Sequence, residues 1–243
     1  MASDAPAVPE TLPRVVPALL SFIAGYVDSC TFLALFGLYV AQLTGSFVLV
    51  GTETVVHDAG AAIKLFAIPT FGLAGAATTV LVRRSRARAA LPATLALEAA
   101  LLVGLLVSWR VGAPLTGRGD PAVIAASLCG LSAMGVQSAL VRLLIKSCPS
   151  TNVMTTNTTL FCVEAADLVL AWRARRRAPG DAAAAAAYAQ VRERFALRWP
   201  IVLGFVAGTA GGALAYARLD LWCLLLVIAV VSALALWARA RRD

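Results

Sequence analysis

The sequence predicts an all-α polytopic membrane protein made of two inverted repeats. Three observations support this class: the composition, the length of the apolar segments, and two polar stretches that align with each other. Of the 243 residues, 60% are hydrophobic and 14% are charged, and the mean hydropathy is +0.82. A soluble domain carries about 25% charged residues. Several apolar runs reach about 18–22 residues, which is the length that spans a lipid bilayer.

Eight predicted segments divide into two sets of four. A tail at residues 1–12 is rich in Pro and Ala and is expected to be disordered. The first repeat covers residues 13–110, a loop on the outer side covers 111–120, and the second repeat covers 121–240. A basic, Ala-rich insert at 173–198 predicts a short surface helix at the cytoplasmic interface. The segments themselves are expected at about 13–35, 41–56, 61–82, 89–109, 121–146, 150–172, 199–217 and 219–238.

A polar stretch opens one segment in each repeat. Eight of the ten residues in Ser150–Thr159 are Ser, Thr or Asn, and Gln42–Ser46 is a weaker copy. In register, Thr44–Glu53 aligns with Thr155–Glu164. Hydroxyl and amide groups in a bilayer cost on the order of several kcal/mol each unless they find partners or line water. We therefore interpret the two stretches as the starts of short half-helices that meet at one central site.

The distribution of Lys and Arg favours six net crossings. If the two polar segments do not cross the membrane, 17 of the 21 basic residues lie inside and four lie outside. If all eight segments cross, the division is 14 to 7, which fits the positive-inside rule less well. Each repeat then has three crossings, so the two halves have opposite orientations. Inverted repeats with discontinuous helices are the architecture of many secondary transporters, and both termini are predicted to be cytoplasmic.

Four motifs occur in order along the chain: AGYVDSCTFLAL at 24–35, AQLTGS at 41–46, AMGVQSALVR at 133–142 and NVMTTNTT at 152–159. Together they resemble the YoaK-like membrane proteins, the bacterial domain-of-unknown-function family numbered 1275, over about residues 13–240. Family members usually have TGN where this chain has Thr44-Gly45-Ser46. The resemblance implies an integral, transporter-like protein of the bacterial cytoplasmic (inner) membrane with no settled substrate.

Candidate binding residues lie in the polar starts and in the apolar segments before them. Asp28 is about ten residues from either end of the first segment, and an isolated carboxylate there usually faces a cavity, a proton path or a polar partner. Gln137 occupies the equivalent place in the second repeat. Half-helix N-termini attract anions while carboxylates attract cations, so the charge of the small-molecule or ion substrate stays open. The predicted binding set is Asp28, Thr44, Gly45, Ser46, Gln137, Asn152, Thr155, Thr156 and Asn157.

Four ionisable residues are candidates for proton or ion coupling: Glu53, Glu98, Glu164 and His57. Structural roles stay open for this set and for the polar starts. Ordinary N-capping uses the same Ser, Thr and Asn residues, and Glu164 is also placed to pair with the basic residues of Arg173–Arg177.

The leading hypothesis is a small secondary transporter. The alternatives are a channel for a small solute or anion, an intramembrane enzyme, and a structural membrane protein. An enzyme needs a nucleophile–base pair, a metal cluster or paired carboxylates, and no such motif is found in the sequence. The five scattered cysteines give no metal or disulfide signal, so no cofactor is expected. The basic residues lie at segment ends, so nucleic acid is not an expected partner, whereas a homo-oligomer stays open.

Overall fold

The chain is helical throughout the part that the structure describes. The computed structural model describes residues 13, 15–56, 61–113, 117, 119–145 and 148–241, and these residues form no strand. In chain order, the elements are α1 (Val15–Ala34), α2 (Leu43–Val56), α3 (Ala61–Arg84), α4 (Ala87–Gly112), α5 (Pro121–Leu144), α6 (Met154–Arg177), α7 (Ala182–Leu219), the short 3₁₀ helix η1 (Asp220–Cys223) and α8 (Leu224–Ala240).

Several of these helices are suited to a lipid environment. Within the described residues, five helical stretches are long and apolar enough to cross a membrane: Val15–Ala34, Leu65–Arg84, Arg88–Gly112, Pro121–Leu144 and Ala182–Ala240. The last stretch contains α7, η1 and α8, and the chain changes direction at Asp220, where φ is +52°. A helix that is apolar on all sides is either buried or faces lipid. The protein is therefore a helical membrane protein, as the composition predicts.

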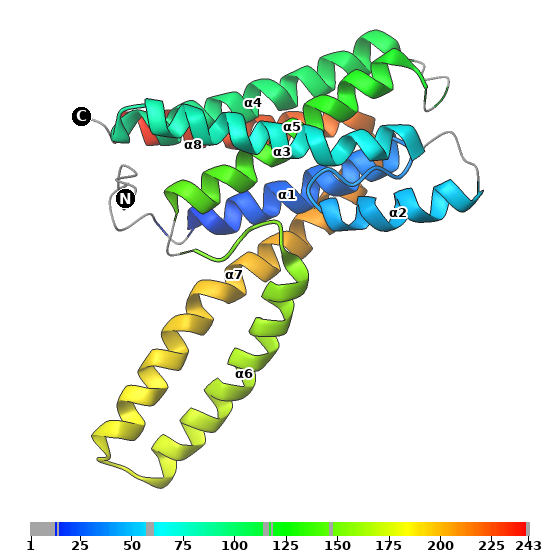
Figure 1. Ribbon diagram of the computed structural model, residues 1–243. Coiled ribbons are helices and arrows are strands. Elements are labelled where there is room, and N and C mark those ends of the chain that lie inside the picture. The colour runs from blue at the N-terminus through cyan, green and yellow to red at the C-terminus, as the bar shows by residue number, and fades with distance from the viewer. Residues whose placement is uncertain are drawn as a thin grey trace.

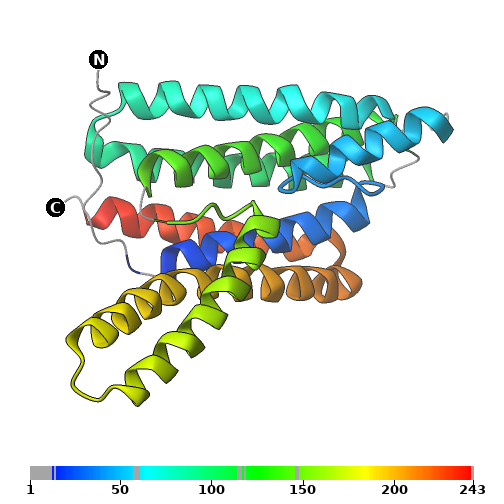
Figure 2. The same ribbon diagram turned by 60° about the horizontal axis from the view of Figure 1, so that its bottom comes forward.

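Two pairs of helices form the centre of the bundle (Figures 1 and 2). α1 packs along α7 and α5 packs along α3, while α4 contacts both α5 and α8. The start of α1 and the ends of α3, α5 and α8 lie on one side of the bundle, at the left in Figure 1. The buried core between these helices is aliphatic and includes the fully buried Leu20, Leu102 and Leu131.

Glycines set the close approach of α1 and α7. Gly204, Gly208 and Gly212 recur every four residues and therefore share one face of α7. A Cβ atom at Gly204 would lie 2.6 Å from the carbonyl oxygen of Ala18, and one at Gly212 would lie 2.6 Å from that of Tyr26. Because the contacted residues increase in step with the glycines, the two helices run parallel. Small residues that allow backbones to touch are the usual basis of helix association in membranes.

The contact between α3 and α5 also depends on a glycine at which the two backbones approach closely. A Cβ atom at Gly135 of α5 would lie 2.7 Å from the carbonyl oxygen of Phe71 in α3. Its counterpart in α1 is Gly25, where a Cβ atom would lie 2.5 Å from the carbonyl oxygen of Phe205 in α7. In both cases a glycine of one repeat lies against the backbone of the other repeat. The two halves of the sequence are thus interleaved in the bundle rather than folded separately.

α2 is short, as the sequence predicts. Its 14 residues extend about 21 Å at 1.5 Å per residue, less than the roughly 30 Å of a bilayer core. The chain turns back before α2 through Phe36 and Gly37, whose φ angles are +55° and +82°. The turn returns the chain along α1, and α2 then packs on α3.

The second polar segment differs from the prediction. α6 has 24 residues, so it is not a short half-helix, and with the first part of α7 it forms a hairpin that leaves the bundle obliquely (Figure 1). Residues 182–198 do not form a separate surface helix, because they begin α7, which continues through Pro200. Alanine is the strongest helix former, and the Asp181 side chain caps the Ala run by accepting a hydrogen bond from the Ala183 N–H.

Candidate functional site

Asp28 holds the chain segment that leads into α2. Its side chain is 2% exposed, and its Oδ1 atom accepts hydrogen bonds from the backbone N–H groups of Val40 and Ala41, both at 2.7 Å. Hydrogen bonds to a carboxylate are short and about twice as strong as neutral ones. The turn at Phe36 and Gly37 makes this contact available, because it returns the chain to the level of Asp28. One oxygen of the carboxylate therefore has a structural role.

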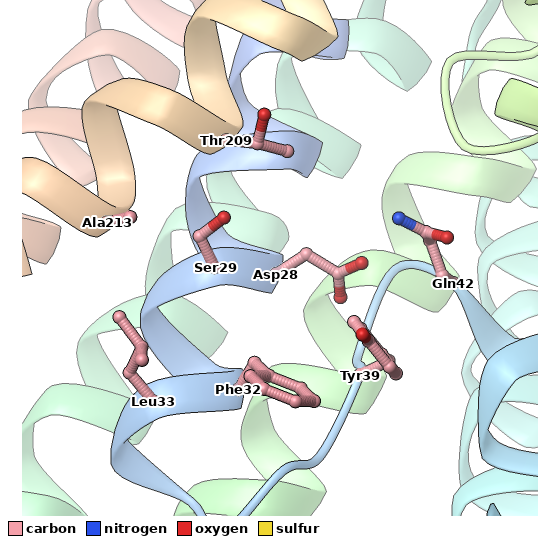
Figure 3. Close-up of a pocket in the computed structure, with 8 residues that line it drawn as sticks. All are labelled: Asp28, Ser29, Phe32, Leu33, Tyr39, Gln42, Thr209 and Ala213. Carbon is pink, nitrogen blue, oxygen red and sulfur yellow. The ribbon is translucent and has the colours of Figure 1, made fainter.

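The other oxygen of Asp28 has no hydrogen-bond partner. Its Oδ2 atom is buried and has no hydrogen-bond partner. Asp28 also lines a cavity of about 320 Å³ between α1, the segment before α2, and α7. Figure 3 shows the carboxylate between the side chains of Ser29 and Gln42, with the rings of Phe32 and Tyr39 below it. The lining residues are Asp28, Ser29, Phe32, Leu33, Tyr39, Gln42, Thr209 and Ala213.

Two rings form one wall of this cavity. Phe32 lies one helical turn after Asp28 in α1, so the two side chains share a face. Tyr39 precedes α2, and its ring centroid is 4.7 Å from that of Phe32, with the planes tilted by 32°. The cavity thus combines one carboxylate oxygen, hydroxyl and amide groups, and an aromatic surface. Small-molecule sites have this character, mostly apolar with a few polar groups that fix orientation.

Gln137 of α5 performs the corresponding task before α6. Its Nε2 atom donates to the Leu20 carbonyl oxygen at 2.9 Å and lies 3.2 Å from Thr151 Oγ1 and 3.3 Å from Asn152 Oδ1. Asn152 Nδ2 in turn donates to the Met134 carbonyl oxygen at 3.5 Å. An amide nitrogen has two hydrogens, so both are fully used by this buried network. The network joins α5 to the segment before α6 and to α1.

The two polar starts make matching contacts. Ser46 Oγ donates to the carbonyl oxygen of Tyr39 at 3.2 Å, and Asn157 Nδ2 donates to that of Ser150 at 2.5 Å. In both cases the acceptor lies seven residues before the donor. The sequence alignment that pairs Ser46 with Asn157 also pairs these two acceptors. Both side chains therefore close the loop that precedes their helix, which is a structural role.

Glu164 forms an ion pair with Arg198 and not with the basic residues at 173–177. Arg198 Nε lies 2.8 Å from Glu164 Oε2 and Arg198 Nη2 lies 3.0 Å from Glu164 Oε1, which is a bidentate arrangement. Arg198 Nη1 also donates to Asn157 Oδ1 at 3.3 Å. Two of the basic side chains expected to pair with Glu164 lie over aromatic rings instead, Arg176 at 4.5 Å from the centroid of Trp172 and Arg175 at 5.2 Å from that of Tyr188. The ion pair ties α6 to α7.

Several predicted binding residues lie away from the cavity. Thr44, Thr155 and Thr156 are exposed, and Gly45 packs against the ring of Tyr39. Among the residues that line the cavity in the described structure, none comes from α5 or α6. This cavity is therefore not enclosed by the two polar starts together, which differs from the single central site that the sequence predicts. The polar starts make two separate polar clusters, one at Asp28 and one at Gln137.

The coupling candidates divide into three groups. Glu98 is 0% exposed, and neither of its carboxyl oxygens has a hydrogen-bond partner. Glu164 has the structural partner described above. Glu53 belongs to α2, but its side chain lies outside the described residues, as does the whole of His57.

The remaining cavity residues carry no individual signal in the sequence. Phe32 could be found from its spacing to Asp28, because positions i and i+4 share a helix face. Tyr39 precedes the polar stretch and resembles an ordinary loop residue, whereas Gln42 is the first residue of that stretch but is not among the predicted binding residues. Thr209 and Ala213 come from α7, about 180 residues after Asp28, and only the packing of α1 on α7 brings them into the site.

Comparison with known proteins places the chain in a family. The model of the family described as "Protein of unknown function (DUF1275)" matches residues 16–237. Since this match covers nearly the whole chain, the protein belongs to that family, as its four ordered motifs predict. No curated protein and no solved structure matches the chain.

Proposed function

For this member of a membrane-protein family without an assigned activity, we propose a secondary transporter whose binding site is the cavity beside Asp28. The observation that carries the proposal is the divided role of one buried carboxylate. Oδ1 holds the segment before α2 in place, and Oδ2 is left without a partner at a cavity. A ligand that contacts Oδ2 would therefore act directly on the position of α2, which couples occupancy of the site to the conformation of the bundle.

The proposed architecture is a pair of inverted repeats with six crossings. The packing of α1 on α7 corresponds to that of α5 on α3, and the packing of α2 on α3 corresponds to that of α6 on α7. Matching hydrogen bonds at Ser46 and Asn157 support the same correspondence. In such proteins, alternating access arises when one repeat moves against the other around a fixed site.

The proposed orientation places both termini in the cytoplasm of a bacterial cell. It follows from the division of basic residues and agrees with the common side on which α1 starts and α8 ends. Cysteine labelling tests it in a variant whose five native cysteines are replaced by alanine. A membrane-impermeant maleimide added to intact cells is expected to label Gly119→Cys and not Ser85→Cys. Labelling of Ser85→Cys from outside would contradict the inverted arrangement.

Glu98 is proposed as a coupling group. It is fully buried in α4 and has no polar partner, and carboxyl groups at membrane depth commonly belong to proton or ion paths. The cavity beside Asp28 does not include Glu98, so the two carboxyl groups are assigned separate tasks. Asp28 contacts the substrate, and Glu98 binds the coupling proton or ion.

The transport proposal is tested with purified protein in liposomes. The liposomes are loaded with a defined mixture of small cationic, neutral and anionic metabolites, and efflux is followed by mass spectrometry under an imposed pH or Na⁺ gradient. At least one solute is expected to leave faster than from protein-free liposomes, with a rate that saturates and responds to the gradient. Asp28→Asn should reduce this rate at least tenfold, while Asp167→Asn in α6 serves as the charge-matched control.

Two results would contradict this proposal. Fast flux that neither saturates nor responds to a gradient would favour a channel, because a transporter must bind its substrate in each cycle. Equal rates for the native protein and for a correctly folded Asp28→Asn variant would remove the proposed site. Asn157→Ala provides a second comparison, since its effect on the rate should be smaller than that of Asp28→Asn.

A further inference from the structure

The sequence leaves the charge of the substrate open, because half-helix starts attract anions and carboxylates attract cations. The arrangement around Asp28 separates these two tendencies. The backbone N–H groups of Val40 and Ala41, which precede α2, are already bonded to Asp28 Oδ1. An anion approaching this end of α2 would therefore find those donors occupied by a carboxylate of the protein itself. It would also face the negative charge of that carboxylate.

The lining of the cavity contains one acidic side chain and no basic one. Among the eight described residues that line it, Asp28 is the only one with a charged side chain. Its Oδ2 atom is buried and accepts no hydrogen bond. A buried charge without a partner is costly, so a positively charged ligand would supply what the site lacks.

The rest of the lining favours an organic cation over a metal ion. Phe32 and Tyr39 present aromatic rings, and a cation over an aromatic face gains cation–π stabilisation. Leu33 and Ala213 add apolar surface. A hard metal cation instead needs about six oxygen ligands, and the described residues contain no group of three His, Cys, Asp or Glu side chains that could hold a metal.

The size of the cavity limits the ligand. Its volume of about 320 Å³ lies at the lower end of the range for small-molecule sites, which is roughly 300–1,000 Å³. Ser29 and Gln42 lie on either side of the carboxylate (Figure 3), and the Ser29 hydroxyl oxygen presents a lone pair to a cation. A single ammonium group with a short alkyl or aromatic substituent fits these properties.

We infer that the cavity beside Asp28 binds a small organic ammonium compound. The ammonium group contacts Asp28 Oδ2 and lies against the rings of Phe32 and Tyr39, and the apolar substituent extends toward Leu33 and Ala213. This inference rests on the proposed transport function, because it takes the bound ammonium compound to be the transported substrate. Binding can nevertheless be measured without transport. The inference assigns the substrate class that the sequence leaves undecided.

A binding experiment with the full-length protein in nanodiscs tests the inference. The probes are benzyltrimethylammonium, the neutral benzyl alcohol, the anionic benzoate, and Na⁺ alone. Benzyltrimethylammonium is expected to raise the melting temperature in a concentration-dependent way, since a ligand of the native state stabilises it by mass action. The other three probes are expected to cause no shift at equal concentrations. A larger shift with benzoate or Na⁺ than with benzyltrimethylammonium would overturn the inference.

Variants connect this binding to the cavity. Asp28→Asn keeps an oxygen for the N–H groups of Val40 and Ala41, and it is expected to raise the Kd for benzyltrimethylammonium at least tenfold. Phe32→Leu removes one ring and should raise the Kd about three- to tenfold. Asp167→Asn, which removes a carboxylate outside the cavity, should leave the Kd unchanged. An unchanged Kd in a folded Asp28→Asn variant would overturn the inference.

A second variant covers the case in which Asp28→Asn does not fold. Ala213→Leu leaves the carboxylate in place and fills the cavity, so it should also raise the Kd at least tenfold, and an unchanged Kd would overturn the inference. The outcome is distinguishable from that of the transport test. Ammonium binding without solute flux would support this inference while contradicting the transport proposal, and coupled flux of an anion without ammonium binding would do the reverse.

Discussion

Asp28 and Gln137 occupy corresponding places in the two halves of the chain, and each holds the segment that precedes the next helix. Asp28 does this with one carboxylate oxygen and leaves the other without a partner at a cavity. Gln137 does it with an amide nitrogen whose hydrogens are both used in a network with Leu20, Thr151 and Asn152. Gln137 Oε1 is likewise buried without a partner, so the unpartnered oxygen belongs to a carboxyl group in the first half and to a neutral amide in the second.

This difference suggests that the two repeats have different roles. The second half contains an ion pair between Glu164 and Arg198, and Arg198 also contacts Asn157. The matching position in the first half is Ser46, which is buried and contacts only the loop before α2 among the described interactions. The counterpart of Glu164 in the first half is Glu53, whose side chain lies outside the described residues, so the difference between the halves rests on Asp28 and Gln137. The first half holds the candidate binding site.

The largest effect on stability is expected from breaking the ion pair. Arg198→Met leaves Glu164, which is 7% exposed, without its bidentate partner. Removing one member of a buried pair costs about 3–5 kcal/mol, and the partial exposure of Arg198 lowers the expectation to about 3 kcal/mol. Unfolding in a detergent and denaturant titration measures this change.

The matched control for that measurement is the double variant Glu164→Gln, Arg198→Met. Because it leaves no unpaired charge, it should be less destabilised than Arg198→Met alone. If both variants unfold at the same denaturant concentration, the pairing of Glu164 with Arg198 makes no measurable contribution to stability.

A smaller effect, equal in the two halves, is expected at the helix contacts. Gly25→Ala and Gly135→Ala each place a methyl group within 2.7 Å of a backbone carbonyl oxygen, and overpacking of this kind costs about 1–3 kcal/mol. Thermal unfolding in nanodiscs should show similar losses for both variants. Gly72→Ala is the control, because a Cβ atom at Gly72 meets nothing within 4 Å. A loss confined to one of the two glycines would show that the halves do not share this packing.

The smallest effects on stability are expected when Gln137 is replaced by a carboxyl residue and Asp28 by an amide residue. In Gln137→Glu, a neutral carboxylic acid offers one donor where the amide offers two, so one hydrogen bond worth about 1 kcal/mol is lost. Asp28→Asn keeps the acceptor that both N–H groups use, and its cost should stay below about 1 kcal/mol. Chemical denaturation of both variants gives these values. A cost of Asp28→Asn above that of Gln137→Glu would mean that the free oxygen of Asp28 is structural.

Much of the fold follows from the sequence, and less of the site does. The apolar runs predict helices in a membrane. The short length of α2 is also predicted, because the apolar segment that forms it covers only about residues 41–56. Asp28 and Gln137 stand out because polar groups at membrane depth are costly. The partner of Glu164 was not predictable, because Arg198 lies 34 residues away and is separated from it by the whole α6–α7 hairpin. The nearer basic residues at 173–177 gave a plausible but incorrect alternative.

The sequence by itself determined that this protein is a helical membrane protein of the DUF1275 family, with two buried polar residues at matching positions. Composition and the length of the apolar runs are enough for the membrane class, because the bilayer allows few ways to satisfy a backbone, and the four ordered motifs carry the resemblance to the family. Only the tertiary structure decided which atoms of those residues are used. Hydrogen-bond partners such as Val40 for Asp28 and Leu20 for Gln137 are brought close by helix packing. The chain turn and the glycine contacts fix that packing, so one oxygen of Asp28 is left without a partner in a residue that lines a cavity.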